Sequence, residues 1–157
     1  MQVIELLRHT VATLAYRSRK VLAGAPEGFG GFCPAPGCRT PGQILAHMGD
    51  LFDWALSLAD GKHVWQDSEP LPWDQEADRF YQALAAFDQR LASSVPLQRR
   101  PEQIFQGPVA DALTHLGQLS MLRRMAGSPV RGENYFRAEI VAARVGRDQA
   151  VAKMEFD

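Results

Sequence analysis

The stretch Thr40-Pro41-Gly42-Gln43-Ile44-Leu45-Ala46-His47-Met48 contains the start of a helix and the first part of its apolar face. Threonine is a preferred N-cap residue, and proline is favoured in the first helical turn. The apolar positions continue at helical spacing through Leu51, Ala55 and Leu58, and Asp60-Gly61 ends the pattern. The stretch therefore predicts an amphipathic helix from about residue 40 to residue 60, with His47 on its inner face.

Three further segments have the same periodicity, at about residues 3–22, 73–95 and 107–126. Each is followed by glycine or proline, which end helices. The chain has no βαβ alternation and no internal repeat. Four amphipathic helices predict an all-α fold, a four-helix bundle that occupies residues 1–127.

Residues 128–157 are harder to interpret. Tyr135, Phe136, Ile140, Val141 and Val145 indicate a short fifth helix or a strand-like arm. We expect this C-terminal extension to pack on the bundle or on a partner subunit.

Length and composition exclude several classes of protein. A chain of 157 residues suits one domain with a sizeable core. Its net charge of -1 gives no electrostatic reason to expect nucleic acid or an anionic membrane as partner. No apolar run approaches the ~20 residues of a membrane span, and the N-terminus does not resemble a signal peptide. We therefore expect a cytoplasmic protein.

The two cysteines, Cys33 and Cys38, lie in a loop rich in glycine and proline. A cytoplasmic protein seldom forms structural disulfides, and one C-x-x-x-x-C pair is a weak zinc signal. The expectation is two loop cysteines without a bridge or a metal ion.

A possible metal site comes from Asp111-x-x-x-His115, followed by Leu116-Gly117-Gln118-Leu119. A spacing of four residues places Asp111 and His115 on one helical face, one turn apart. His47 could supply a third ligand from a neighbouring helix, because packed helices lie only ~8–10 Å apart. Two imidazoles and a carboxylate suit a divalent first-row metal ion and leave positions open for water or substrate.

Each of these residues also has an ordinary structural explanation. Asp111 could be stabilised by the helix dipole, and the two histidines could be core residues with hydrogen-bonded partners. His9 and His63 are expected near the surface. Three neighbouring residues each have two possible roles. Asp50 could hydrogen-bond to His47 or be a solvated carboxylate, and Trp54 could be a core residue or form a pocket wall. Gln118 could orient His115 or pack at a helix contact.

The motifs Arg39-Thr40-Pro41-Gly42-Gln43-Ile44-Leu45-Ala46-His47 and His115-Leu116-Gly117-Gln118-Leu119, in this order, resemble the DinB-like (YfiT-like) superfamily of metalloenzymes. The resemblance covers about residues 1–127. It implies a four-helix bundle with up-down-down-up connectivity and a three-histidine metal site. The first and last histidines of that site match His47 and His115, whereas the middle one is replaced by Asp111.

The resemblance implies a divalent metal ion, Zn, Ni, Fe or Mn, held by His47, Asp111 and His115. It also implies a thiol-dependent S-transferase that uses a low-molecular-weight thiol, and we expect a homodimer. A metal-dependent hydrolase with the same ligands is an alternative. A non-enzymatic bundle, structural or binding a small molecule, is a third possibility.

Overall fold

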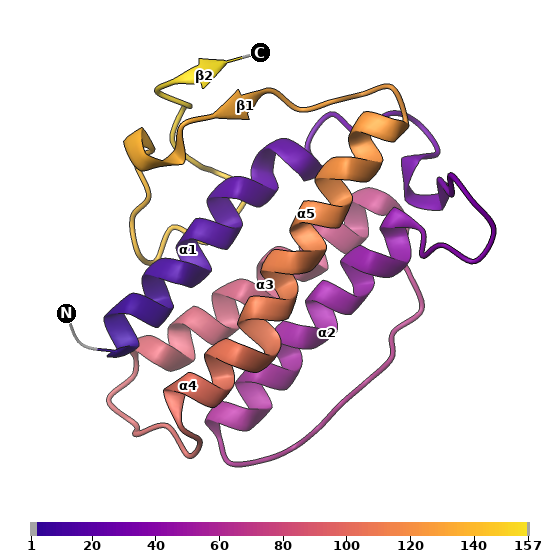
Figure 1. Ribbon diagram of the computed structural model, residues 1–157. Coiled ribbons are helices and arrows are strands. Elements are labelled where there is room, and N and C mark those ends of the chain that lie inside the picture. The colour runs from indigo at the N-terminus through magenta and orange to yellow at the C-terminus, as the bar shows by residue number, and fades with distance from the viewer. Residues whose placement is uncertain (1–2, 157) are drawn as a thin grey trace.

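The computed structural model describes residues 3–156, which form mainly helices (Figure 1). The long helices are α1 (Val3–Leu22), α2 (Pro41–Ala59), α3 (Trp73–Ala92) and α5 (Ala110–Met125). The one-turn helix α4 (Pro101–Ile104) precedes α5. The all-α prediction is confirmed, and the predicted helices at 3–22, 40–60 and 73–95 match α1, α2 and α3.

The start of α2 is defined by a capping box. The Thr40 hydroxyl accepts a hydrogen bond from the Gln43 backbone N–H, and the Gln43 side chain accepts one from the Thr40 N–H. Pro41 occupies the first turn, where its missing N–H has no cost. Gly61, with a φ of 79°, ends the helix in a conformation that favours glycine. Because both ends of α2 are fixed locally, the position of His47 along the helix is fixed as well.

The last helix of the bundle begins earlier than the sequence predicted. The expected start lay near Gly107-Pro108, but α4 begins at Pro101 and continues into a π-helical turn over Phe105–Val109 before α5. Pro108 lies inside that turn. Proline cannot donate a hydrogen bond within a helix, and the wider π turn accommodates it without ending the helix.

The core lies between the four long helices and is rich in aromatic side chains. The ring of Phe52 on α2 lies 6.2 Å from that of Phe80 and 5.8 Å from that of Phe87, both on α3. All three side chains are fully buried. Large buried rings dominate the energetics of a core, so these residues hold α2 and α3 together.

Contacts between charged side chains give the relative directions of the helices. On α3, Arg79 pairs with Asp50 near the middle of α2, and Arg90 pairs with Asp60 at its end, so α2 and α3 run parallel. Parallel neighbours need a long connection, and residues 60–72 supply it along the outside of the bundle (Figure 1). Arg8 on α1 donates to both carboxylate oxygens of Asp88 near the end of α3, so α1 runs antiparallel to α3.

Arg123 joins the ends of α1 and α5. Its guanidinium donates to the carbonyls of Val21, Ala23 and Gly24, and its Nε donates to that of Ser128. It lies in the last turn of α5, where its charge complements the helix dipole, and it also caps the C-terminus of α1. Burial lowers the pKa of this arginine.

The C-terminal extension is an irregular arm that crosses α1. Strands β1 (Gly132–Glu133) and β2 (Glu155–Phe156) pair antiparallel, and a 3₁₀ turn spans Tyr135–Arg137. The prediction of a fifth helix is therefore wrong, and the strand-like arm describes the extension better. Its short elements are held by contacts with the bundle rather than by helical periodicity.

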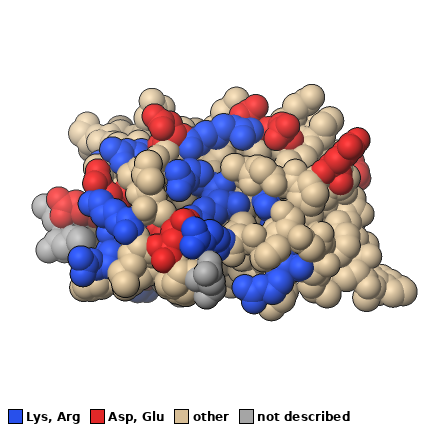
Figure 2. Space-filling view, turned by 90° about the horizontal axis from the view of Figure 1, so that it is seen from above, with Lys and Arg blue, Asp and Glu red and all other residues tan. Residues whose placement is uncertain are grey.

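Glu133 attaches this arm to α1. The hydroxyl of Tyr16 donates to Glu133 at 2.6 Å, and Lys20 lies 2.9 Å from the same carboxylate. Lys20 also pairs with Glu155. Figure 2 shows this end of the molecule, where basic side chains gather with acidic side chains among them.

Within residues 3–156, no helix combines the length and the apolar character that crossing a membrane requires.

Candidate metal centre

The structure brings the three predicted ligands together. His47 comes from α2, and Asp111 and His115 lie one turn apart on α5. One donor atom from each residue lies within 4.8 Å of the other two. The side chains of His47 and His115 are 19% and 12% exposed, and that of Asp111 is 45% exposed. The group therefore lies at the edge of the α2–α5 interface and can be reached from solvent.

Both imidazoles direct Nε2 toward the aspartate. The distance from His47 Nε2 to Asp111 Oδ2 is 3.3 Å, and that from His115 Nε2 to Asp111 Oδ1 is 3.5 Å. The two rings lie edge to face, with centroids 4.8 Å apart. On the opposite edge of His115, Nδ1 lies 2.7 Å from Oε1 of Gln118 and donates to it. A neutral ring with its proton on Nδ1 presents a lone pair at Nε2, as a metal ligand must.

This arrangement fits a divalent cation. Metal bonds of ~2.0–2.2 Å to nitrogen and oxygen place neighbouring ligand atoms about 3.0–3.5 Å apart. The distances from His47 Nε2 to Asp111 Oδ2, 3.3 Å, and from His115 Nε2 to Asp111 Oδ1, 3.5 Å, are of that size, and each ends on a different carboxylate oxygen. With its proton on Nδ1, a neutral His115 directs the lone pair of Nε2 toward the same carboxylate that would share the ion. The donor set suits a divalent ion, and the hydrogen bond that His115 donates to Gln118 would orient one of its ligands.

Two tryptophans form a wall beside the histidines. The ring of Trp65 lies 5.5 Å from that of His47 and 5.7 Å from that of Trp54. Trp54 was predicted to be a core residue or a pocket wall; it is half-buried and packs against the core while its ring contacts Trp65. Trp65 was not identified from the sequence, because it lies in the connector between α2 and α3, which has no periodicity.

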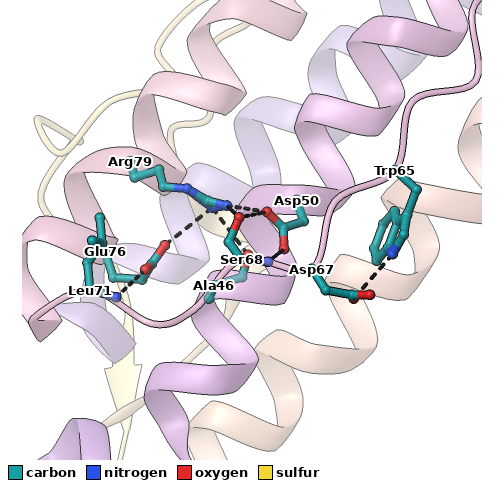
Figure 3. Close-up of polar contacts among 8 residues, drawn as sticks. All are labelled: Ala46, Asp50, Trp65, Asp67, Ser68, Leu71, Glu76 and Arg79. Carbon is teal, nitrogen blue, oxygen red and sulfur yellow. Dashed lines mark hydrogen bonds and ion pairs between the residues drawn. The ribbon is translucent and has the colours of Figure 1, made fainter.

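The connector that carries Trp65 is attached to the bundle by a buried polar network (Figure 3). Asp50 accepts hydrogen bonds from the backbone N–H of Ser68 at 2.8 Å and from its hydroxyl at 2.7 Å. Arg79 pairs with Asp50 and with Glu76, and Glu76 accepts the N–H of Leu71 at 2.8 Å. The network holds residues 68–71 against α2 and α3.

Asp50 thus has a role that the sequence did not predict. It is only 3% exposed, so it is not a solvated carboxylate, and it is bound by Ser68 and Arg79 rather than by His47. Gly49 explains how the arginine reaches it: a Cβ atom at this position would collide with the Arg79 guanidinium. A glycine within the helix weakens it, but here it leaves space for the ion pair.

The remaining histidines do not join the cluster. His9 and His63 are exposed, as predicted, and His63 packs against Trp54 with ring centroids 5.5 Å apart. The described residues contain one such group of potential ligands, made of His47, Asp111 and His115.

The expectation for the cysteines was wrong about the bridge. Cys33 and Cys38 form a disulfide, with Cα atoms 6.1 Å apart. Gly37, at a φ of 79°, turns the Pro-Ala-Pro-Gly loop back so that the two cysteines meet. The expectation rested on the general rarity of cytoplasmic disulfides, which does not take this local loop geometry into account. The bridge lies just before the N-cap of α2.

Comparisons of the chain with protein-family models, with curated proteins and with solved structures give no match.

Proposed function

We propose that this chain is a metal-dependent enzyme that holds one divalent ion through His47, Asp111 and His115. The observation that carries the proposal is the convergence of three donor atoms from two helices within 4.8 Å. Two of the ligands are neutral imidazoles and one is a carboxylate. The ligand set would leave a divalent site with net positive charge, suited to a substrate or water that ionises on binding.

We further propose that the bundle has the DinB-like up-down-down-up topology. The parallel arrangement of α2 and α3 and the long connector between them support this connectivity. Residues Arg39–His47 and His115–Leu119 support the same family from the sequence. Asp111 in place of the family's middle histidine supplies an anionic oxygen ligand, which favours iron, manganese or zinc.

The reaction we propose is transfer of a whole thiol to an organic acceptor. A C–S bond forms at an electrophilic carbon as that carbon's bond to its leaving group breaks, and the leaving group departs with the bonding electrons and takes up the thiol proton. A divalent ion bound at this centre would lower the pKa of a coordinated thiol and so supply a thiolate at neutral pH. The residues of the chain do the positioning: Gln118 holds the proton on Nδ1 of His115, and Trp65 shields one side of His47 from water. The exposed Asp111 leaves an approach from solvent.

The test is the metal content of protein purified without a histidine tag, measured by elemental analysis. We expect one divalent ion per chain in the wild type and almost none in His47→Ala and in His115→Ala. His9→Ala, an exposed histidine outside the cluster, is the matched control and should keep full occupancy. Full occupancy in both cluster variants would rule the site out.

One observation favours a second candidate, a structural polar cluster without catalysis. The 3.3 Å distance between His47 and Asp111 is also compatible with a hydrogen bond. Such a cluster would contain no stoichiometric metal, and chelator would not change the thermal stability of the protein. If the metal site exists, removal of the ion should lower the melting temperature, because the ligand binds only the folded state.

A further inference from the structure

Two hollows that share Arg39 in their linings each include one of the two cluster histidines. The larger has a volume of about 520 Å³ and includes His115 in its wall. The smaller has a volume of about 220 Å³ and includes His47. Because the two imidazole rings are 4.8 Å apart, a molecule in either hollow would lie beside the proposed ion.

The two hollows differ in chemistry. Ile44, Met121 and Leu122 give the larger hollow a mainly apolar wall, and its volume suits a small organic molecule. The smaller hollow is lined by polar side chains, among them Asp67 and Ser68. An apolar substrate body would therefore occupy the larger hollow, on the His115 side.

Arg39 belongs to the lining of both hollows and is exposed. Within the described chain, no hydrogen bond or ion pair occupies its guanidinium, whereas Arg79, Arg90 and Arg123 are all engaged. It immediately precedes Thr40, the N-cap of α2, whose dipole adds positive potential there.

The charge balance indicates what Arg39 can bind. The smaller hollow also contains Asp67 and Glu69, whereas the described residues that line the larger hollow include no acidic one, and Arg39 is their one lysine or arginine. On the side of the larger hollow Arg39 therefore matches a single negative charge. A guanidinium forms two parallel hydrogen bonds with a carboxylate. The exposed carboxylate of Asp111 would repel an anion from the other side of the metal centre.

We infer that the substrate is an organic carboxylate, with its carboxylate on Arg39, its apolar body in the larger hollow and its reacting atom at the metal centre. This inference rests on the proposed function, because it takes His47, Asp111 and His115 as the reacting centre. Arg39 is then a residue that selects the substrate by charge.

The experiment compares two probes of nearly equal shape, 4-phenylbutanoate and 4-phenylbutanamide, by calorimetric titration. The wild type should bind the acid about tenfold more tightly than the amide, as expected for a charge-assisted pair at a partly exposed site. Arg39→Gln should bind both probes equally. Arg124→Gln, an exposed arginine on α5 that lines neither hollow, should keep the preference.

His115→Ala separates this inference from the proposed function. If Arg39 binds the carboxylate, the preference for the acid should survive in His115→Ala, which lacks the proposed ion.

A preference lost in His115→Ala but kept in Arg39→Gln would mean that the metal centre binds the acid. That result would overturn this inference and leave the proposed metal site intact. Equal affinities in the wild type, or no binding of either probe, would overturn it too. A preference that depends on Arg39 in a wild type without metal would support carboxylate binding and contradict the metal site.

Discussion

His115 and Gln118 are joined by a hydrogen bond of 2.7 Å between Nδ1 and Oε1. They lie three residues apart on α5, so the contact follows from the helix itself. By holding the proton on Nδ1, the amide oxygen of Gln118 leaves Nε2 free to face Asp111. A polar residue that a sequence motif places beside a histidine thus selects its tautomer.

Replacing this partner should weaken the metal site without removing a ligand. Gln118→Leu is expected to lower metal affinity by about 10- to 100-fold, the usual effect of losing an outer-shell hydrogen bond. Competition with a chelator of known affinity measures the change. Gln103→Leu, an exposed glutamine on α4, is the control. Equal affinities in both variants and the wild type would show that Gln118 does not orient the ligand.

Arg79 should be important for stability because two buried carboxylates, Asp50 and Glu76, depend on it. Arg79→Met leaves them without a counter-charge, and we expect a loss of about 3–5 kcal/mol in the free energy of unfolding. Denaturant unfolding measures it. Arg147→Met, in the C-terminal extension, removes an exposed pair with Asp78 and a hydrogen bond to the Asp74 carbonyl at the start of α3, and should cost less, about 1 kcal/mol. Equal costs would contradict a structural role for the network.

The bundle could be predicted because its helices carry local signals. The cap at Thr40, the terminal Gly61 and the apolar stripes define the helices within a few residues. Asp111 and His115 could be paired for the same reason, since one helical turn separates them. Adding His47 needed only the assumption that two predicted helices are neighbours.

The rest depends on contacts between distant parts of the chain. Arg79 and Asp50 are 29 residues apart, and nothing in either segment marks them as partners. Trp65 reaches His47 only because the Ser68 network fixes a connector without periodicity. The structure of the C-terminal extension could not be predicted for the same reason, since Glu133 and its partner Tyr16 are 117 residues apart in the sequence. Long-range polar contacts of this kind leave no periodic signal in one sequence.

The contact between Tyr16 and Glu133 should make the protein sensitive to alkaline pH. Burial raises the pKa of Tyr16 to about 12, and the hydrogen bond to Glu133 adds to the shift. The neutral phenol is favoured in the folded state, so its contribution to stability is complete below about pH 10, the pKa of an unfolded tyrosine. It is lost as the pH rises through 12, by up to about 1.4 kcal/mol per pH unit.

Tyr16→Phe tests this prediction through unfolding free energies measured between pH 9 and pH 12. The variant should be less stable at neutral pH, because Glu133 loses a donor, but its stability should fall less steeply above pH 10. Burial also raises the pKa of Tyr81 to about 12, so some alkaline dependence should remain. An unchanged slope in Tyr16→Phe would show that Tyr16 does not cause the loss.

Asp111 gives the sharpest test of the metal centre, because it could be a ligand or a partner of the helix dipole. Asp111→Asn keeps the shape but removes the charge and leaves a poor ligand, so metal occupancy should fall sharply. Asp111→His should restore a three-nitrogen site and keep metal, with a changed preference among metal ions. Asp111→Ala should lose metal. If the carboxylate only complemented the helix dipole, Asp111→Ala would instead lower the free energy of unfolding by about 0.3–1 kcal/mol and leave metal occupancy unchanged. Elemental analysis of the three variants decides between the roles, and equal metal in the wild type, Asp111→Asn and Asp111→Ala would exclude a carboxylate ligand.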